Sequence, residues 1–296
     1  MMFPRDTLPP TMELPVLTYH SVLSADLYYP IHVNNSWIIS EAAFEEQMRY
    51  LYENGYQTIN AAQLYGFLYH GEDLPGNAVL ITFDDGYLDN AVFACPIMRR
   101  FGFVGILFMI TSKIAEEPGT VGAYPLRFMS LSDMEGIRDV FAFGSHTHDM
   151  HHFVEGDKAR LLLESVSSIR ADLRRSLEQD FISIEVGFAF PYGRHSENAV
   201  QALREEGVPC AFTTAPGYVE RGLDLFRLPR FSVTSSWTMG QFSQVVSGEW
   251  VPEGVGECKK QACSEPVFLR EKPTIRYTFR WIRSLAFFRV NFCEFL

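Results

Sequence analysis

Histidine is concentrated in one short stretch of the chain. Four of the eight histidines, His146, His148, His151 and His152, fall within seven residues directly after an apolar run. Imidazoles at this density are an efficient supply of metal ligands, although a solvated loop could carry them without function. Two imidazoles need a third, preferably anionic, ligand to hold a catalytic divalent ion with an open coordination position. The stretch therefore predicts part of a metal site.

A pair of carboxylates offers the anionic ligand. An apolar run ends in Asp84 and Asp85, and Gly86 follows. Side chains on a regular strand alternate between its faces, so both carboxylates can serve one site only if the strand breaks into a turn, which Gly86 permits. The pair invites opposite roles, one carboxylate binding metal and the other accepting a proton. An Asx turn or a helix cap is the structural alternative.

Two further apolar runs end in groups that could join this site. His20 ends the first run, and Pro191 and Gly193 follow another. A Pro and Gly turn would fix a stiff loop whose backbone N–H groups could point at a ligand oxygen. Each signal alone has an ordinary explanation, a buried core histidine or a simple turn. Barrel enzymes, however, collect catalytic groups at the C-terminal ends of several strands.

The elements that would position these residues alternate along the chain. Apolar runs alternate with segments of helical period, which indicates repeating β-α units around a largely parallel sheet. Strands are expected over 16–20, 78–83, 104–110, 141–145, 187–190, 211–214 and 228–233. Helices are expected between Ser40 and Gly55, over 157–177 and over 197–206. The fold class is therefore α/β.

Composition limits the classes of function. The chain has 296 residues, of which 47% are hydrophobic and 21% charged, so it can bury a sizeable core. Its formal net charge of -11 argues against a nucleic-acid partner, because neutralising phosphates needs a basic face. The N-terminus lacks a signal-peptide core, and no apolar run reaches the roughly 18 residues of a membrane span, so a cytoplasmic location is expected. Five scattered cysteines, including Cys258 and Cys263, favour reduced thiols over a disulfide framework or a zinc knuckle.

The chain is expected to divide into three segments. These are an N-terminal extension over 1–13, one catalytic domain over 14–248 and a short C-terminal extension over 249–296. The last part of that extension, 270–296, is aromatic and basic. Such a tail could pack on the domain as a terminal helix, associate peripherally with a membrane or dock a protein partner.

The motifs together resemble a known family. The segments that carry the resemblance are 82–86, 144–147 with the histidines after it, 188–193 and 228–230. They look like the ordered motifs of polysaccharide deacetylases of the NodB-homology type, carbohydrate esterase family 4. The opening segment 17–22 is similar to the branch that contains the poly-N-acetylglucosamine deacetylases. The resemblance spans about residues 14–248 and implies a distorted (β/α) barrel, commonly of seven strands, that holds one divalent ion.

The resemblance also implies a ligand set for that ion. Asp85 and His146 would be the first two ligands. The common family spacing would place the third ligand at Met150, whereas the spacing in the similar branch selects His151, with His152 as the fallback. Zinc is the expected metal, and iron, cobalt and nickel accept the same ligands.

Roles in catalysis follow from the same resemblance. Asp84 would be the general base, and the loop of Pro191 and Tyr192 would contact the substrate, with the Tyr192 backbone N–H stabilising the oxyanion. No histidine follows His195, so the late histidine that protonates the leaving amine in the wider family is missing. In the poly-N-acetylglucosamine branch a histidine on the first strand is assigned this work, and His20 matches it.

One departure from the family pattern concerns the partner of the base. Many members have an arginine two positions before the proline of the third motif, and this chain has Ala189 there. A buried carboxylate without a nearby cation would have a raised pKa, which would weaken its role as the general base. Arg230 is the expected replacement, with Arg194 as the second candidate.

The function expected from these residues is metal-dependent hydrolysis. The substrate would be an N-acetylated amino sugar or polysaccharide, from which the N-acetyl group is removed. Hydrolysis of another non-peptide C–N amide on the same scaffold is an alternative, since fold alone does not set the substrate. A catalytically silent glycan-binding protein and an iron oxygenase are two more, because two histidines and one carboxylate also suit iron. Hydrolysis is favoured because Asp84, next to the expected ligand Asp85, could act as a base beside the metal.

Overall fold

The computed structural model describes residues 13–28, 35–122, 126–154 and 156–251. The chain divides into two units, residues 1–252 and 253–296, and all described residues belong to the first. Predictions for the tail over 270–296, and for Cys258 and Cys263, lie outside the described residues. The boundaries expected at residues 13 and 248 stay predictions.

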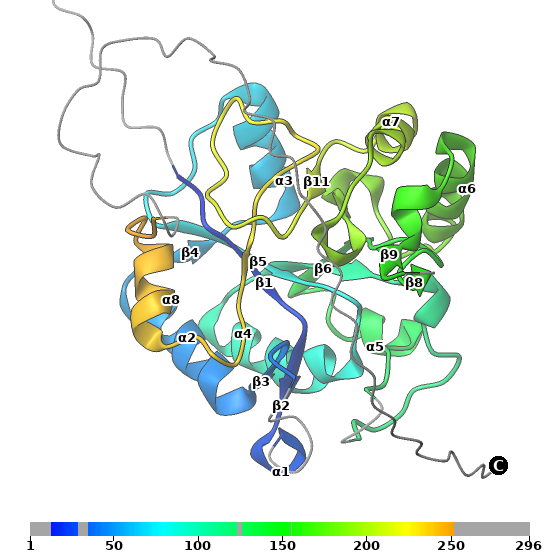
Figure 1. Ribbon diagram of the computed structural model, residues 1–296. Coiled ribbons are helices and arrows are strands. Elements are labelled where there is room, and N and C mark those ends of the chain that lie inside the picture. Colours follow the sequence, from blue (N-terminus) through cyan, green and yellow to red (C-terminus); the bar gives the residue numbers. More distant parts are fainter. Residues whose placement is uncertain (1–12, 29–34, 123–125, 155, 252–296) are drawn as a thin grey trace, which may run out of the picture. The chain divides into compact units, whose positions relative to one another are not determined.

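Parallel strands form one curled sheet at the centre of the fold (Figure 1). In spatial order the row is β11 (Ala211–Phe212), β10 (Phe188–Ala189), β7 (Phe141–Ser145), β6 (Gly105–Met109), β5 (Ala78–Phe83), β1 (Val16–Tyr19) and β12 (Phe231–Ser232), and β4 (Gln57–Thr58) pairs with the start of β5. A parallel bridge between Phe212 and Leu228 brings the segment before β12 beside β11, so the two ends of the row approach each other. The expected distorted barrel of about seven strands is confirmed.

Two small sheets flank this row. The parallel pair β2 (Ser21–Leu23) and β3 (Ile38–Ser40) follows β1, and the antiparallel pair β8 (Phe153–Val154) and β9 (Lys158–Ala159) follows β7. The sequence analysis predicted neither pair. Strands of two or three residues are too short to show an alternating pattern of hydrophobic side chains.

Burial explains why the central strands were recognisable. All six residues of β5 are buried, as expected for a parallel strand that is covered on both faces. The bounds of β5 and β7 agree with the predicted ranges, whereas the other five strands are shorter than predicted. The predicted range 187–190 yields only Phe188–Ala189, because Pro191 begins a short 3-10 turn, η6 (Pro191–Gly193).

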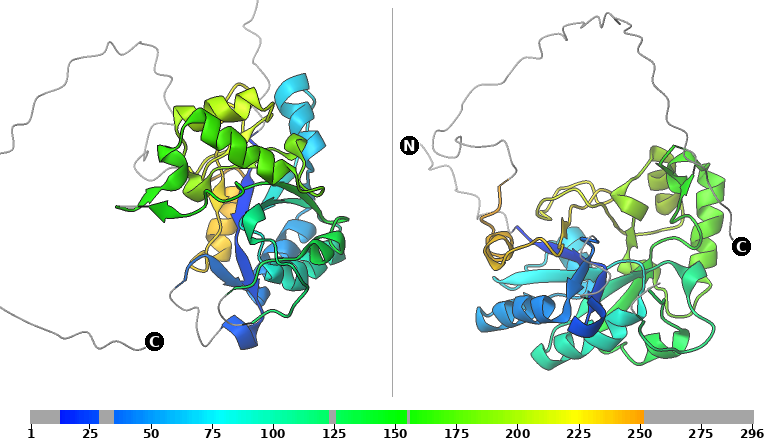
Figure 2. Two further views of the ribbon diagram at one scale, coloured as in Figure 1. Left: turned by 90° about the vertical axis from the view of Figure 1, so that its right-hand side faces the viewer. Right: turned by 60° about the horizontal axis from the view of Figure 1, so that its bottom comes forward.

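Helices cover the outside of the strands (Figure 1). They are α1 (Ala25–Tyr28), α2 (Glu41–Glu53), α3 (Ala61–Tyr65), α4 (Cys95–Phe101), α5 (Leu131–Glu135), α6 (Val166–Leu177), α7 (Glu197–Glu205) and α8 (Met239–Val246). α6 and α7 lie side by side (Figure 2). None of the described helices is long and apolar enough to cross a membrane.

Helix α2 confirms the predicted caps. Its N-cap Ser40 accepts the Ala43 N–H, and Gly55 follows the helix end in the left-handed region with φ of 70°. This agreement reflects the strength of Ser as an N-cap and Gly as a helix stop.

Helix α6 differs from its predicted start at residue 157. Lys158–Ala159 forms β9, a 3-10 turn η4 (Arg160–Leu163) follows, and Glu164 is extended. The helix starts at Val166 because the Ser165 side chain caps it by accepting the Ser168 N–H. The leucines before the cap continue the helical period without belonging to the helix.

Candidate active site

A cavity of about 340 Å³ opens at the carboxyl ends of the central strands, and we call it the strand-end cavity. Its lining includes His20 after β1, Asp84 and Asp85 after β5, His146 after β7 and Tyr192 after β10. The C-terminal edge of a parallel sheet is where barrel folds assemble their reactive groups. The predicted convergence of these five residues is present in the structure.

The backbone after β5 turns both carboxylates toward the cavity. Asp84 continues the strand, whereas Asp85 has φ of 74° and Gly86 has φ of 89°. The turn therefore begins at the second carboxylate and continues through the glycine, as the sequence analysis required. A non-glycine residue in the left-handed region costs about 1–3 kcal/mol and persists only where the surroundings impose it. The positive φ favours glycine at position 86, and a Cβ there would also lie 2.5 Å from the end of the flexible Met109 side chain.

Asp85, His146 and His151 form a cluster that we call the metal triad. The Asp85 Oδ1 atom lies 3.6 Å from His146 Nε2 and 3.5 Å from His151 Nε2. Ligands bonded to tetrahedral zinc at about 2.0–2.1 Å lie roughly 3.3 Å apart, which is close to these separations. Among the described residues, Asp85 Oδ1 is a buried oxygen without a hydrogen-bond partner. Its burial and its missing partner fit a cation held between the three side chains.

Hydrogen bonding fixes which nitrogen of His146 faces the triad. Its Nδ1 lies 2.7 Å from the carbonyl oxygen of Ala189. A carbonyl only accepts, so Nδ1 carries the proton and Nε2 presents a lone pair to the cavity. Burial lowers the pKa of His146 to about 3, and burial also lowers the pKa of His151. Both imidazoles are therefore neutral, as metal ligands must be.

Arg230 pairs with Asp84 inside the barrel. Its Nη1 and Nη2 donate to Asp84 Oδ1 and Oδ2 at 2.8 and 2.7 Å, a bidentate geometry. Nε donates to the Thr213 carbonyl at 3.0 Å. The side chain is fully buried, and its guanidinium carbon lies 5.7 Å from the ring centroids of both Phe108 and Phe212. Arg230 therefore pairs with Asp84, as the sequence analysis expected in the absence of an arginine at 189.

The charge state of Asp84 follows from this pair. Burial by itself would raise the pKa of the carboxyl, but the charge and hydrogen bonds of Arg230, with a contribution from His146, hold it well below its usual range. Asp84 Oδ2 also lies 4.0 Å from His146 Nε2, so the carboxylate stands beside the metal triad. An ionised carboxylate next to a cation site can accept a proton.

His20 is held on the rim of the same cavity by the backbone. Asn90 Nδ2 donates to the His20 carbonyl at 2.8 Å, and Asp89 accepts from the Ser21 hydroxyl and the Val22 N–H. The His20 ring lies 4.6 Å from the Trp37 ring, and its Nδ1 is buried without a partner among the described residues. The imidazole is therefore available to a bound molecule.

The loop after β10 contributes the aromatic wall of the cavity. Pro191 is buried, and Tyr192 adopts φ of 57°. The Tyr192 ring lies 4.4 Å from the ring of the triad residue His151 and 4.0 Å from that of Phe153. The preference for glycine at 193 is steric, since a Cβ there would meet Thr214 Oγ1 at 2.0 Å. The loop conformation is therefore set by close packing against the segment after β11.

Other residues from the sequence analysis lie outside the metal triad. His148 Nδ1 bonds Thr111 Oγ1 at 3.0 Å, and His152 does not belong to the triad. Arg194 donates to the Asp157 carbonyl and lies over the Phe153 ring instead of reaching Asp84. Of the four clustered histidines, the structure brings only the pair spaced by five residues to Asp85.

Comparison with known proteins agrees with this geometry. The family model described as polysaccharide deacetylase matches residues 71–211, which include both carboxylates and the whole histidine cluster. Residues 71–211 therefore form a domain of the polysaccharide deacetylase family. The family and the class of enzyme predicted from the sequence, a de-N-acetylase, are confirmed.

Individual members of the polysaccharide deacetylase family resemble most of the described chain. A Bacillus subtilis protein named polysaccharide deacetylase YxkH is 28% identical over 234 residues, covering 79% of this chain and 76% of its own. The poly-beta-1,6-N-acetyl-D-glucosamine N-deacetylase of Staphylococcus epidermidis is 24% identical, covering 68% of this chain and 69% of its own. The structure of IcaB from Ammonifex degensii superposes with a TM-score of 0.65 at 24% identity, over 79% of this chain and 96% of its own. This superposition supports the deacetylase fold.

Several residues of the strand-end cavity were not found by sequence reasoning. They are Asn35, Trp37, Ile38, Tyr87, Leu126 and Thr214. Trp37 is 42% exposed and lies beside His20, so it offers an apolar face at the cavity mouth. A tryptophan shortly before a short strand carries no catalytic motif. The only available signal was that it follows His20 closely in the chain.

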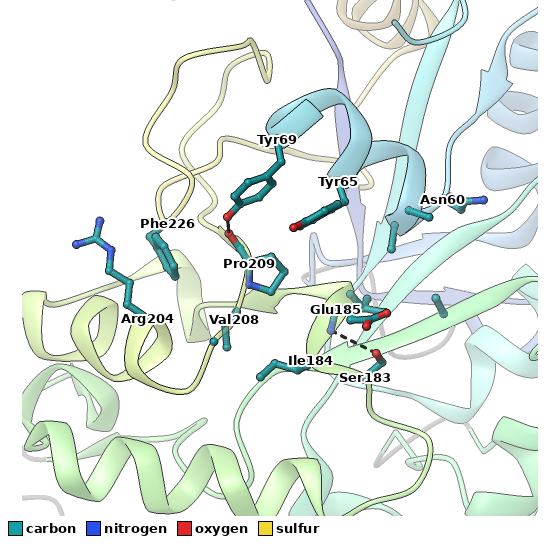
Figure 3. A pocket seen from close by; sticks show the side chains of 15 residues that line it. Asn60, Tyr65, Tyr69, Ser183, Ile184, Glu185, Arg204, Val208, Pro209 and Phe226 are labelled. Atoms are coloured by element: carbon teal, nitrogen blue, oxygen red, sulfur yellow. Dashed lines mark hydrogen bonds between the residues drawn. The ribbon is translucent and has the colours of Figure 1, made fainter. Parts of the chain in front are cut away.

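A larger cavity, which we call the opposite cavity, lies at the other end of the strands. It measures about 840 Å³ and is lined by residues that precede β10 and β11, among them Ile184 and Pro209. Figure 3 shows Tyr65 and Tyr69 above this space, and the Tyr69 hydroxyl donates to the Pro209 carbonyl. None of its lining residues belongs to the metal triad. Size alone therefore does not mark the reactive site.

Proposed function

We propose that this polysaccharide deacetylase is a metal-dependent de-N-acetylase that acts on N-acetylated amino sugars within a glycan at the strand-end cavity. The observation that carries the proposal is the ionised Asp84, paired with Arg230, directly beside the Asp85, His146 and His151 cluster. The acyl carbon of the substrate would gain a water oxygen and lose the sugar nitrogen. The products would be acetate and a free amine.

Asp85, His146 and His151 would hold one divalent ion, for which zinc is the expected identity. The ion would supply Lewis acidity that polarises the acetyl carbonyl and lowers the pKa of water. The chain prepares the site by keeping both imidazoles neutral and by aiming Nε2 of His146 into the cavity. The Asp85 oxygen without a hydrogen-bond partner would become the anionic ligand.

Asp84 would accept the proton of the attacking water. Arg230 keeps the Asp84 carboxylate ionised. Its two hydrogen bonds, one to each carboxylate oxygen, fix the orientation of the base before substrate binds. Because Arg230 is buried and cannot move into solvent, the base is not free to rotate away. A base of lowered pKa is compatible with this role because the water it deprotonates would be acidified in the same cavity.

His20 would return a proton to the leaving nitrogen. A sugar amine is a poor leaving group unless it is protonated as the C–N bond breaks. His20 lines the cavity together with Asp84 and keeps an unpartnered ring nitrogen there. The Tyr192 backbone N–H would donate to the oxyanion, while its ring and Pro191 would form one wall of the acetyl pocket.

The test is release of acetate and free amine from N-acetylglucosamine oligomers. The zinc-loaded parent would be compared with Asp84→Asn and with Asp139→Asn. Asp139 pairs with Arg99 at the surface, so the second variant makes the same chemical change away from the cavity. The parent and Asp139→Asn should release acetate and amine in equal amounts at similar rates, and Asp84→Asn should release them at least about 10²-fold more slowly.

Metal dependence is tested in the same assay. Dialysis against a chelator should abolish acetate release, and readdition of zinc should restore it. Activity that survives complete removal of metal would contradict the role of the metal triad. Zinc binding without any acetate release would point to a different amide or to a glycan-binding role.

A further inference from the structure

The two histidines of the metal triad sit at the ends of one short segment, residues 146–151, which we call the metal loop. His146 is fixed by β7 and β6, since its N–H donates to the Met109 carbonyl at 2.8 Å. Among the described residues, no backbone hydrogen bond joins His151 to a central strand, although its ring packs 4.4 Å from the Tyr192 ring. The course of the four residues between the histidines therefore contributes to the distance between the two imidazoles, and so do the contacts that hold the middle of this loop.

The loop follows a strained path. Thr147 is β-branched and has φ of 75°, a conformation that costs roughly 1–3 kcal/mol. Its N–H donates to Ser145 Oγ, and its own hydroxyl accepts the Met150 N–H. These contacts lie within the loop and its strand. They leave the N–H groups of His148 and Asp149 to be satisfied from outside.

Asp172 on α6 satisfies both of those groups. Its Oδ2 accepts the His148 N–H at 2.7 Å, and its Oδ1 accepts the Asp149 N–H at 2.8 Å. Asp172 as a whole residue is 8% exposed, and no ion pair among the described residues includes its carboxylate. A buried carboxylate without a cation is costly, so its two short amide bonds are its compensation.

Helix α6 provides a rigid base for this contact. Ile169 and Leu173, on either side of Asp172 in sequence, are buried in the core. One turn after Asp172, Ser176 bonds Ser145 Oγ at 2.8 Å, and Ser145 is the acceptor for the Thr147 N–H. The helix therefore contacts the metal loop at its middle and supports it at its start.

We propose that Asp172 is a positioning residue that fixes the metal affinity of this enzyme, because its carboxylate holds the metal loop in the ligand-bearing conformation before the ion binds. The inference rests on the proposed function, since it takes the metal triad as the ion site. Asp172 lies outside the triad and outside the motifs that the sequence analysis identified.

The test measures zinc binding directly, in the absence of substrate. Asp172→Asn keeps the size of the side chain but replaces one acceptor with an NH2 group that faces a backbone N–H. Zinc affinity, from competition with a chromophoric chelator, should fall by up to about 10-fold, the lower end of the effect of losing a group bonded directly to a metal ligand, because Asp172 holds the backbone between two ligands. Asp172→Glu keeps two acceptor oxygens and should retain more affinity than Asp172→Asn.

Asp224→Asn is the matched control. Asp224 also accepts a backbone N–H, that of Phe226, but it lies near the opposite cavity. Its zinc affinity should equal that of the parent. Ser176→Ala gives an independent arm if Asp172→Asn fails to fold, because alanine favours the helix while the support of Ser145 is lost. That variant should weaken zinc binding severalfold.

The outcomes separate the inference from the proposed function. If the parent binds zinc and deacetylates, and the folded Asp172 and Ser176 variants bind zinc as tightly, the inference is overturned and the function stands. A loss of thermal stability in the apo variants with unchanged zinc affinity would show a structural role only, and would also overturn it. If the parent binds no zinc, both the metal part of the proposed function and this inference fail. Reduced zinc affinity in both variants, with Asp224→Asn unchanged, supports the inference.

Discussion

The two cavities at the ends of the sheet differ in what holds their walls. The opposite cavity is the larger, about 840 Å³ against 340 Å³, and its mouth is formed by exposed tyrosines on a helix. The strand-end cavity is lined by buried carboxylates and imidazoles, and two of its residues, Asp85 and Tyr192, adopt left-handed backbone conformations. Of the two cavities, only the strand-end cavity combines non-glycine residues in left-handed conformations with buried ionisable side chains. Strained backbone and buried charge, both of which cost free energy, therefore indicate the reactive site better than cavity volume does.

The largest expected effect is at the base in the strand-end cavity. Asp84→Asn keeps the shape and removes the proton acceptor, so kcat for deacetylation should fall roughly 10²- to 10⁴-fold. Steady-state acetate release measures it, with zinc content checked in parallel. A variant with full zinc occupancy and near-parent kcat would show that another group takes the proton.

The next effect concerns the leaving group. His20→Gln should lower kcat for an N-acetylglucosamine oligomer about 10²-fold, because the amine must be protonated as it departs. The same variant should be affected only slightly with p-nitrophenyl acetate, whose phenolate leaves without a proton. Comparing the two substrates separates a loss of leaving-group protonation from a loss of substrate binding. An equal loss on the two substrates would assign His20 to a different role.

Arg230 gives a pH-dependent effect. In the parent it holds the Asp84 pKa below its usual value, so the pair contributes fully to stability above about pH 4 and loses that contribution as the pH falls. In Arg230→Met the main opposition to burial is lost, so the Asp84 pKa rises and the acidic limb of the kcat/KM profile should move to higher pH. Stability should fall by about 3–5 kcal/mol because a buried charge is left alone.

The matched control for that variant is Arg227→Met. Arg227 pairs with Glu197 and Asp224 at the surface, so it should leave the pH profile unchanged. Denaturant unfolding and the pH dependence of kcat/KM check both variants. An unmoved acidic limb in a folded Arg230→Met protein would remove Asp84 from the titration that limits activity.

The smallest effect is expected at the opposite cavity. Tyr69→Phe removes the hydroxyl that donates to Pro209, and Glu185→Gln removes an exposed charge. Deacetylation rates should stay within about twofold, and unfolding free energies within about 1 kcal/mol. Steady-state kinetics and thermal unfolding measure these changes. A large loss of activity from either change would erase the contrast between the two ends.

The sequence predicted the strands and the site unequally well, for physical reasons. β5 and β7 were found with their bounds because a buried parallel strand is a continuous apolar run. The start of α6 was missed because the leucines before Ser165 keep a helical period while they belong to a 3-10 turn. Asp84, Asp85 and the histidines stand out by type and spacing. Trp37 and Asp172 do not, because their importance comes from what the fold places beside them.

The residues of the metal triad and the cation that pairs with Asp84 come from distant parts of the chain. All three residues of the metal triad and Asp84 lie before residue 152. Arg230, which keeps Asp84 ionised, lies 146 residues after it. A chain that is being synthesised therefore contains the proposed metal ligands before it contains the partner of the proposed base. Only when the segment that leads into β12 joins β1 and β11 does the guanidinium enter the barrel. Under the proposed function, a chain that ended before β12 would leave Asp84 without its cation, and the base would lack the partner that keeps it ionised.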